Sequence, residues 1–378
     1  MYLKSLSLQN FRNCSKKTFG FSPDTTLILG PNASGKTNIL EAIYLLSRGR
    51  SFRAKRELEM ISYDGELARV EGEVGGKLEI ILTTGQVQSK SVAKKLFKVN
   101  GVGKRMMDYI GNFKSVLFRP EDIDIVLGSP SIRRNYLDSI LDLVDREYRV
   151  CNVVYKKGLR QRNKLLEGIR QGWAKKPQLE YWNRLVIKNG QIVSRKREEL
   201  IEFFNSQFVI FKNKKDFGGL VVEYDESPIS IERLAKYAEA EVGAGVTLVG
   251  PHRDDMKFTV PSSALGASHR LIQPRLPRDA SAGRQSSQFT VNRDLNLFGS
   301  RGEQRMAVLG LKLAELKYIE QQTEQTPLLL LDDIFSELDE KHRLQVINLV
   351  KSRQSIISSV DLNFEGRDLL GKIKVIHL

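Results

Sequence analysis

A glycine-rich loop near the start of the chain has the residue types and spacing of a phosphate-binding loop. It follows the pattern G-x-x-x-x-G-K-[ST] through Gly30, Pro31, Asn32, Ala33, Ser34, Gly35, Lys36 and Thr37. Its glycines let backbone N–H groups turn toward phosphate oxygens at a helix start. Lys36 is predicted to reach the β- and γ-phosphates of ATP, and the Thr37 hydroxyl is predicted to bind Mg²⁺. The alternative is a glycine-rich turn without a ligand.

Two carboxylates far along the chain complete the chemistry that such a loop requires. Asp332 and Asp333 follow the apolar run 328–331, which is expected to be a buried strand. In P-loop ATPases, an acidic residue at such a strand end holds Mg²⁺. We therefore expect Asp332 to meet the metal beside Thr37, and we interpret Asp333 as a second catalytic carboxylate.

A third segment precedes these carboxylates by about one helix. Ser300, Gly302 and Gln304 open a helix whose apolar face continues through Met306, Leu309, Leu313 and Leu316. This Ser-x-Gly-x-Gln start, followed by an acidic strand end, resembles the signature region of the ABC ATPases. Such a site is complete only when two heads meet. Ser300 and Glu303 also form an ordinary capping box, which needs no nucleotide.

The elements that must position these residues are those of an α/β protein. A strand at 25–29 precedes the phosphate loop and a helix at 38–47 follows it. Short alternating runs over 66–101 predict antiparallel strands and hairpins, and a strand is expected at 116–118. Further strands are expected at 245–249, 256–260 and 355–359, the last being the final core strand, with a helix at 340–351. Glu121, after strand 116–118, has either a role at Mg²⁺ or a role as a helix-start carboxylate.

The middle of the chain is helical and basic. One apolar stripe from Leu137 to Tyr155 predicts a long helix, and a second stripe runs from Leu179 to Phe203. Residues 131–205 hold 17 Lys or Arg against 9 Asp or Glu. Phosphate-neutralising side chains are expected outside the stripes or at their ends. The candidates for DNA contact are Arg133, Arg134, Lys156, Lys157, Arg160 and Arg162. A merely solvated basic face is the alternative.

The composition narrows the class of protein. The 378 residues are 41% hydrophobic, enough for a real core, and a net charge of +15 suggests a polyanionic partner. No apolar run approaches the roughly 20 residues that span a bilayer, so no membrane role is expected. The chain starts on a strand-like stretch, and Cys14 and Cys151 lack metal-ligand spacing. These features predict a protein of the reducing cytoplasm.

The motifs together resemble the RecF family, bacterial recombination-mediator ATPases related to the SMC heads. The resemblance covers nearly the whole chain. The segments that carry it are NFRN (10–13), GPNASGKTN (30–38), PED (120–122), GSPSIRRNYLD (128–138), QRN (161–163), GPHRDD (250–255), SRGEQR (300–305) and LLDDIFSELD (330–339). It implies an ABC-type head at 1–129 and 246–378 and an inserted, basic, mainly helical arm at 130–245. The stretch 261–290 is longer than the family leads us to expect.

The resemblance also implies how the parts work. Arg12, Asn13 and Asn38 would join the phosphate loop in binding ATP, and Asp333 would polarise the attacking water. Ser300, Gly302 and Gln304 would reach the γ-phosphate held by the partner head, and Asp339 would couple the two sites. ATP would close a homodimer on duplex DNA at gap edges, and slow, DNA-stimulated hydrolysis would release it. RecR, RecO and RecA would be partners at the nucleoid. Ser358 and Ser359 stand where many ABC ATPases have a switch histidine.

Three other classes share part of this pattern. A transporter ATPase subunit has the same nucleotide motifs, but it would leave the basic helical insert unexplained. A full SMC protein needs a far longer coiled coil between its half-heads. A non-hydrolysing DNA-binding scaffold would keep the fold, and Lys36 and Asp333 would then be dispensable because there would be no turnover.

Overall fold

A five-stranded parallel sheet brings the two predicted chemical segments to one edge. The computed structural model describes residues 2–212, 219–261, 292–337, 340–361 and 370–378. The strand order is β10-β14-β15-β3-β16, and each neighbouring pair is parallel. The strands are β3 (Thr25–Leu29), β10 (Ser115–Phe118), β14 (Leu328–Asp332), β15 (Ser355–Ser359) and β16 (Ile373–His377). The prediction that 355–359 is the last core strand is wrong, because β16 adds an edge beside β3.

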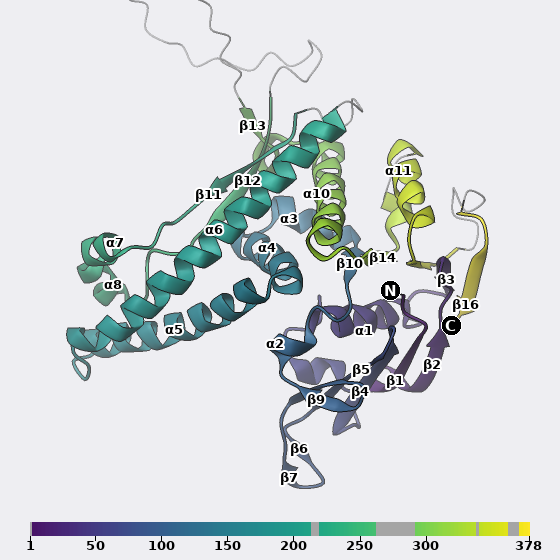
Figure 1. The fold of residues 1–378 in the computed structure, drawn as a ribbon, viewed down its shortest axis with the longest axis horizontal. Coiled ribbons are helices and arrows are strands. Elements are labelled where there is room, and N and C mark those ends of the chain that lie inside the picture. Colours follow the sequence, from purple (N-terminus) through teal and green to yellow (C-terminus); the bar gives the residue numbers. More distant parts are fainter. Residues whose placement is uncertain (1, 213–218, 262–291, 338–339, 362–369) are drawn as a thin grey trace, which may run out of the picture.

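A second sheet is antiparallel and six-stranded, in the order β2-β1-β4-β5-β8-β9. Its strands are β1 (Ser5–Phe11), β2 (Cys14–Gly20), β4 (Leu67–Glu73), β5 (Lys77–Thr83), β8 (Lys95–Val99) and β9 (Val102–Lys104). The short strands β6 (Gln86–Val87) and β7 (Lys90–Ser91) form a projecting hairpin (Figure 1). Helix α1 (Lys36–Arg48) packs against strands of both sheets, so its apolar residues are buried on two sides. The predicted antiparallel strands of 66–101 are confirmed.

Three helices build the arm. They are α4 (Pro130–Val144), α5 (Arg146–Arg170) and α6 (Leu179–Lys212), and α5 and α6 lie side by side (Figure 1). The prediction of one continuous helix from Leu137 to Tyr155 is wrong. Asp145 has extended backbone angles and accepts a hydrogen bond from the Tyr148 N–H, so it ends α4 and caps α5. The apolar stripe survives the break because both helices face one core.

The hydrophobic core that α4 and α5 share joins the arm to elements beyond residue 219. It contains apolar residues of α4, α5, α6 and α10 (Arg301–Thr323), and of the sheet β11-β12-β13. The strands are β11 (Val221–Asp225), β12 (Asp255–Pro261) and β13 (Asn292–Asp294), and α9 (Leu295–Phe298) follows them. Strand β11 pairs with β12 across the predicted domain boundary at residue 246. The predicted loop 261–290 and Asp339 fall on or within the segments 262–291 and 338–339, outside the described residues.

The tip of the arm has a small core of its own. Helices α7 (Ile231–Lys236) and α8 (Ala238–Ala244) pack there, with Tyr155, Val186 and Val249 buried beneath them. The prediction of a strand at 245–249 is wrong. The segment is irregular, because its backbone N–H groups donate hydrogen bonds to side chains and not to a neighbouring strand. Thr247 N–H donates to Asn163, and Leu248 N–H donates to Glu241.

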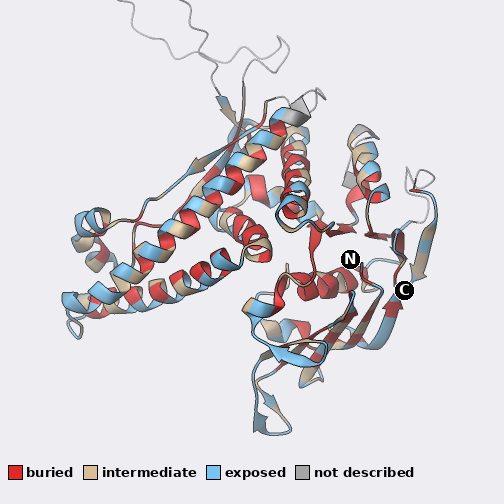
Figure 2. Cartoon of the chain, viewed as in Figure 1, coloured by how far each residue is buried: buried red, intermediate tan, exposed pale blue. Residues whose placement is uncertain are grey.

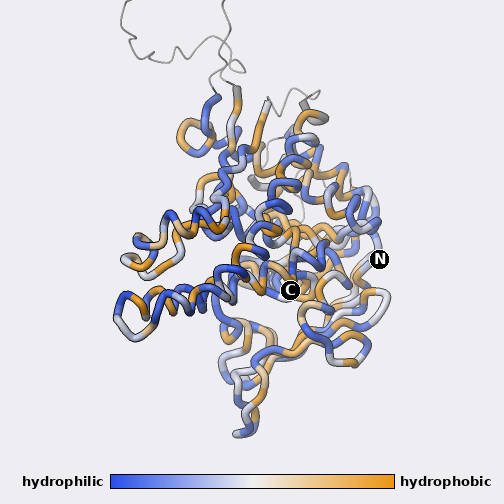
Figure 3. The backbone as a smooth tube through the Cα atoms, turned by 60° about the vertical axis from the view of Figure 1, so that its left-hand side comes forward, coloured by the Kyte–Doolittle hydropathy of each residue, from blue (hydrophilic) through white to orange (hydrophobic). Residues whose placement is uncertain are grey.

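The remaining described elements are short or cover the parallel sheet. They are η1 (Glu57–Met60), α2 (Met106–Tyr109), η2 (Pro120–Ile123), α3 (Asp124–Leu127), η3 (Lys176–Gln178), η5 (Ile334–Glu337) and α11 (Glu340–Lys351). Buried residues concentrate in the central strands, α1 and α10, whereas the arm helices are buried along one side (Figure 2). The projecting arm and hairpin carry long hydrophilic stretches (Figure 3). Among the described helices, none is long and apolar enough to cross a membrane.

Candidate nucleotide site and basic arm

The phosphate loop adopts the backbone conformation that its glycines predict. Gly35, the N-cap of α1, has φ of +104°, and Ala33 has φ of +65°. A Cβ added at Gly30 would lie 2.6 Å from the Ser34 hydroxyl oxygen, so a side chain at this position would force Ser34 to shift. The first turn of α1 contains no acidic residue, and its free N–H groups and dipole therefore favour an anion.

Lys36 lies inside this loop. It is only 8% exposed, and its Nζ donates hydrogen bonds to the carbonyl oxygens of Gly30 (2.7 Å) and Pro31 (2.9 Å). A buried ammonium within a ring of backbone groups is suited to neutralise phosphate oxygens entering the loop. The predicted position of Lys36 is thus consistent with its predicted role.

Thr37 and Asp332 meet although 295 positions separate them. The Thr37 hydroxyl donates to Asp332 Oδ1 at 3.2 Å. Ser358, at the end of the neighbouring strand β15, donates to the same oxygen at 2.7 Å. A hydroxyl and a carboxylate oxygen at the mouth of a phosphate loop are the ligand types that Mg²⁺ prefers. The residues present therefore fit a magnesium ion, and Ser358 orients the carboxylate that would bind it.

Asp333 turns away from the strand. Its φ is +50°, a left-handed conformation that aspartate tolerates better than most residues, and the residue is exposed. Its backbone N–H donates to the Ser358 hydroxyl at 3.1 Å. Ser358 therefore links the Asp332 carboxylate to the backbone of Asp333. Ser359 is not part of this group, because its hydroxyl donates to the Asp361 carbonyl.

The turn at Asn10–Asn13 lies beside the phosphate loop, but only part of it is turned toward the loop. Asn13 accepts a hydrogen bond from Asn38 at 2.6 Å, and its Oδ1 lies 3.3 Å from a Cβ added at Gly35. Arg12 instead donates two hydrogen bonds to the buried carboxylate of Glu41 and one to the Glu59 carbonyl. Arg12 thus fixes the turn at Asn10–Asn13 to α1, and no local sequence signal indicated this role.

A cavity of about 790 Å³ opens beside Thr37 and Asp332. Glu121 lines it and is exposed, whereas the neighbouring Asp122 is buried and caps η2 by accepting from the Arg119 N–H. Both carboxylates lie in the first turn of η2, and Asp122 is the one that accepts the capping hydrogen bond. Among the described residues that line this cavity, none comes from 300–304. The signature segment is thus not part of the cavity beside its own phosphate loop.

The start of α10 combines a cap with an exposed surface. Ser300 accepts from the Glu303 N–H, and Glu303 accepts from the Ser300 N–H at 2.8 Å, so the capping box is present. Ser300 is nevertheless exposed, and a Cβ added at Gly302 would meet no atom within 4 Å. No described residue therefore requires glycine at position 302, although glycine weakens a helix.

Gln304 does not have the predicted role. It is 6% exposed, and its Nε2 donates to the carbonyl oxygens of Leu295 (2.9 Å) and Gly299 (3.0 Å). The prediction that Gln304 reaches a partner's nucleotide is therefore wrong: its amide holds the preceding turn against α10.

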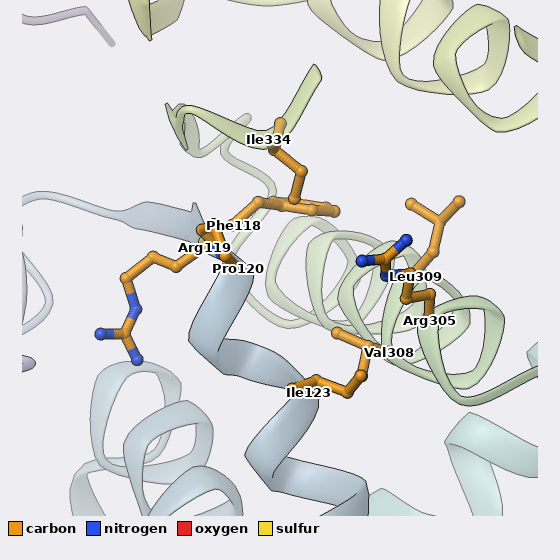
Figure 4. Close-up of a pocket in the computed structure, with 8 residues that line it drawn as sticks. All are labelled: Phe118, Arg119, Pro120, Ile123, Arg305, Val308, Leu309 and Ile334. Carbon is orange, nitrogen blue, oxygen red and sulfur yellow. The ribbon is translucent and has the colours of Figure 1, made fainter. Parts of the chain in front are cut away.

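Helix α10 is tied to the chemical edge of the sheet in two ways. Val308 and Leu309 share a small apolar pocket with Phe118, the last residue of β10, and with Pro120 and Ile334, which follow β10 and β14 (Figure 4). Deeper in the helix, Lys312 forms ion pairs with Asp122 and Glu315. Burial lowers the pKa of Lys312, but these carboxylates more than offset burial and raise it.

Glu315 also binds Arg48, at the end of α1, at 2.9 Å. This buried network links the helix after the phosphate loop to the helix after the signature segment.

The arm does not present all its basic residues to solvent. Arg133 is 6% exposed and forms a bidentate pair with Asp255, and Arg162 is 2% exposed and binds Glu241 at 2.6 Å. The prediction that these two arginines contact DNA is wrong, because their buried guanidinium groups pair with the partly buried Asp255 and the fully buried Glu241. Arg134 donates to the Asp254 carbonyl, and Lys156 pairs with Asp138.

Lys156, Lys157 and Arg160 are all exposed, but of these only Lys157 and Arg160 form no ion pair with a described residue. Lys157 and Arg160 are exposed on α5, as is Lys164, and none of the three forms an ion pair with a described residue. Their spacing of three and four residues places them on one stripe of the helix, about 10 Å long. The sequence places Lys164 among the basic residues of this segment without distinguishing it from its neighbours, and only the structure separates the cations that form ion pairs from those that form none with a described residue.

Comparisons with known proteins agree with these features. Residues 2–365 match the family model described as RecF/RecN/SMC N terminal domain. The DNA replication and repair protein RecF of Exiguobacterium sp. is 32% identical, covering 100% of this chain and 97% of that protein. RecF of Oceanobacillus iheyensis is 31% identical, covering 96% of this chain and 94% of that protein.

Solved structures show the same relationship. A structure of the recombination mediator protein RecF with ATP, in the RecFOR pathway, is 30% identical with a TM-score of 0.81. It covers 96% of this chain and 92% of that chain. An SMC head bound to a domain of ScpA, at 16% identity and a TM-score of 0.51, shares the fold alone. The α/β head with an inserted helical arm is thus confirmed, and the chain belongs to the RecF family.

Proposed function

We propose that this chain is an ATP- and Mg²⁺-dependent DNA-binding ATPase of recombinational gap repair. The observation that carries the proposal is the contact between the Thr37 hydroxyl and Asp332 at the mouth of the phosphate loop. It joins the two halves of a nucleotide site across the parallel sheet. RecF proteins are DNA replication and repair proteins, and a relative has been solved with ATP.

Each residue at the site has a distinct task. The loop from Gly30 to Asn38 would hold the phosphates, with Asn13 beside it, and Lys36 would neutralise charge on the β- and γ-phosphates. Thr37 and Asp332 would hold Mg²⁺, which would supply positive charge to offset the negative charge that develops on the phosphates. The exposed Asp333 carboxylate would orient the attacking water. Aspartate is one methylene shorter than the glutamate of most ABC heads, so we expect slow turnover.

ATP would act by joining two copies. Ser300 and Gly302 are exposed, and the cavity beside their own phosphate loop is lined by other described residues. They are therefore free to approach the γ-phosphate held by a second copy. We propose that ATP binding closes this homodimer on DNA and that hydrolysis, stimulated by DNA, opens it.

The DNA would be a duplex next to a single-strand gap, in contact with Lys157 and Arg160 on α5. From there the protein would assist RecA loading with RecR and RecO, in the cytoplasm at the nucleoid. The exposed, unpaired stripe on α5 supports a phosphate-backbone contact, which carries no sequence preference.

Binding of a fluorescent gapped duplex, with and without ATP, tests the clamp. Wild type should bind more tightly with ATP, whereas Ser300→Arg should bind ATP but lose the ATP effect on DNA. Ser352→Arg, at another exposed serine, is the control and should behave as wild type. Equal DNA binding by all three proteins, unchanged by ATP, would refute the clamp.

A second assay separates an ATPase from a non-hydrolysing scaffold. Phosphate release should be lost in Lys36→Met and in Asp333→Asn, while Asp333→Asn should still bind ATP. If wild type releases no phosphate with Mg²⁺ and gapped DNA present, the scaffold class is favoured.

A further inference from the structure

Two large apolar side chains are exposed immediately before the signature segment. Leu297 is 72% exposed and Phe298 is 62% exposed, on the short helix α9. Single exposed apolar residues are common, but two adjacent ones beside a functional segment suggest an interaction site. We propose that Leu297 and Phe298 form a hydrophobic anchor that docks onto a second copy of this chain, at the rim of its phosphate loop. This proposal rests on the ATP-closed dimer proposed above.

The turn that carries the anchor is held rigidly from below. Leu295, on the same turn, is 1% exposed, and Gln304 donates to the Leu295 and Gly299 carbonyls. Arg293 donates to the Phe298 carbonyl at 2.6 Å and also binds Glu303. Hydrogen bonds from two side chains therefore fix the backbone, while Leu297 and Phe298 remain outside. Such a preorganised apolar turn loses little entropy when it binds.

The anchor is continuous with the surface that the composite site uses. Phe298 is two residues from Ser300, so its Cα lies at most about 7.6 Å away. Any surface that contacts Ser300 and Gly302 must therefore come close to Phe298. Because a Cβ added at Gly302 would meet no described atom within 4 Å, one approaching surface explains both the glycine and the exposed apolar side chains. That surface is the nucleotide face of a second copy.

The second copy offers an apolar rim at that face. Leu58 is 46% exposed and Tyr63 is 103% exposed. They lie on either side of residues 59–62, whose backbone contacts the turn at Asn10–Asn13. Arg12 N–H donates to the Met60 carbonyl, and the Ser62 N–H donates to the Asn10 carbonyl. The rim is thus fixed beside the turn that holds Asn13 against Gly35. In a two-fold dimer each copy supplies one anchor and one rim, so the contact between anchor and rim occurs twice.

The test compares the dimerisation of wild type and of L297S/F298S, which is measured by sedimentation velocity in the presence of ATP and Mg²⁺. Four buried apolar side chains are lost per dimer, so we expect the dissociation constant of the dimer to rise at least ~100-fold. ATP affinity of the monomer and the circular dichroism spectrum should match wild type. The matched control is W173S/Y181S, which removes two exposed aromatic residues, 57% and 63% exposed, from the arm. This control should dimerise normally.

The outcomes distinguish this inference from the proposed function. If wild type forms no dimer with ATP, the clamp and the anchor are both overturned. If wild type and L297S/F298S dimerise equally, the anchor is overturned while the clamp stands. The same holds if the variant dimerises normally and loses only DNA binding.

Cross-linking locates the rim. A chain with Phe298→Cys and Tyr63→Cys should give a covalent dimer with a bismaleimide only when ATP is present, since the native Cys14 and Cys151 are buried. If ATP dimers form without this product, the assignment of the rim is wrong.

Discussion

The exposed stripe on α5 gives the sharpest test of how this protein binds DNA. Lys157, Arg160 and Lys164 lie at intervals of three and four residues and have no ion pair with a described residue. If each contacts one phosphate, binding releases the counterions of three phosphates. Each contact contributes about 0.9 to the slope of log K against log salt, so K157A/R160A/K164A should lower that slope by about 2.7.

This slope change has a measurable size. Between 50 and 200 mM salt, a difference of about 2.7 in slope corresponds to roughly a 40-fold change in relative affinity. The affinity deficit of the variant should therefore be about 40-fold smaller at 200 mM than at 50 mM. Fluorescence anisotropy of a gapped duplex in a salt titration, with ATP present, measures both slopes.

The control must remove the same charge elsewhere. Lys16, Lys90 and Lys104 are exposed on the antiparallel sheet and its hairpin, away from the arm. K16A/K90A/K104A should leave the slope close to that of wild type. A parallel salt dependence for wild type and the α5 variant would refute the contact. So would an equal loss of slope in the control, which would indicate only a net-charge effect.

Three further predictions concern single residues. Ser358→Ala should raise the Mg²⁺ concentration needed for half-maximal hydrolysis by about 10-fold, because Asp332 loses the hydroxyl that orients it. Arg162→Met should reduce the free energy of unfolding in urea by about 3–5 kcal/mol, because Glu241 stays buried without its cation. Burial lowers the pKa of His252 to about 4, so protons bind the unfolded chain more strongly below pH 6.5. Stability should therefore fall with pH from 6.5 to 4, by about 2 kcal/mol at pH 5 through this group.

Each of these has a contrasting outcome. Ser359→Ala should leave the Mg²⁺ dependence unchanged, because that hydroxyl binds the Asp361 carbonyl instead. An Arg162→Met protein of normal stability with weakened DNA binding would restore this arginine to the DNA site. His252→Gln should flatten the pH dependence between 4 and 6.5, and an unchanged pH profile would contradict the argument.

Local sequence determined the nucleotide elements. The phosphate loop needs glycine, lysine and threonine at fixed spacing, and β3 (Thr25–Leu29) and β14 (Leu328–Asp332) are short apolar runs with polar ends. Neighbours along the chain suffice to specify such features. The helix break at Asp145 also had a local signal, since aspartate is a favoured N-cap and Glu147 follows in the first turn. The apolar periodicity across the break obscured it.

Tertiary structure decided which side chains are available. Arg160 and Arg162 are two positions apart on the same helix, yet one faces solvent and the other binds the buried Glu241 of α8. Gln304 matched a signature pattern, but its amide donates to carbonyls of the turn that precedes its own helix. A charged side chain or an amide can bind a ligand only if no other group of the protein already pairs with it or accepts its hydrogen bonds. Those distant partners are brought close by packing, as Asp332 is to Thr37, and no local pattern in the sequence encodes them.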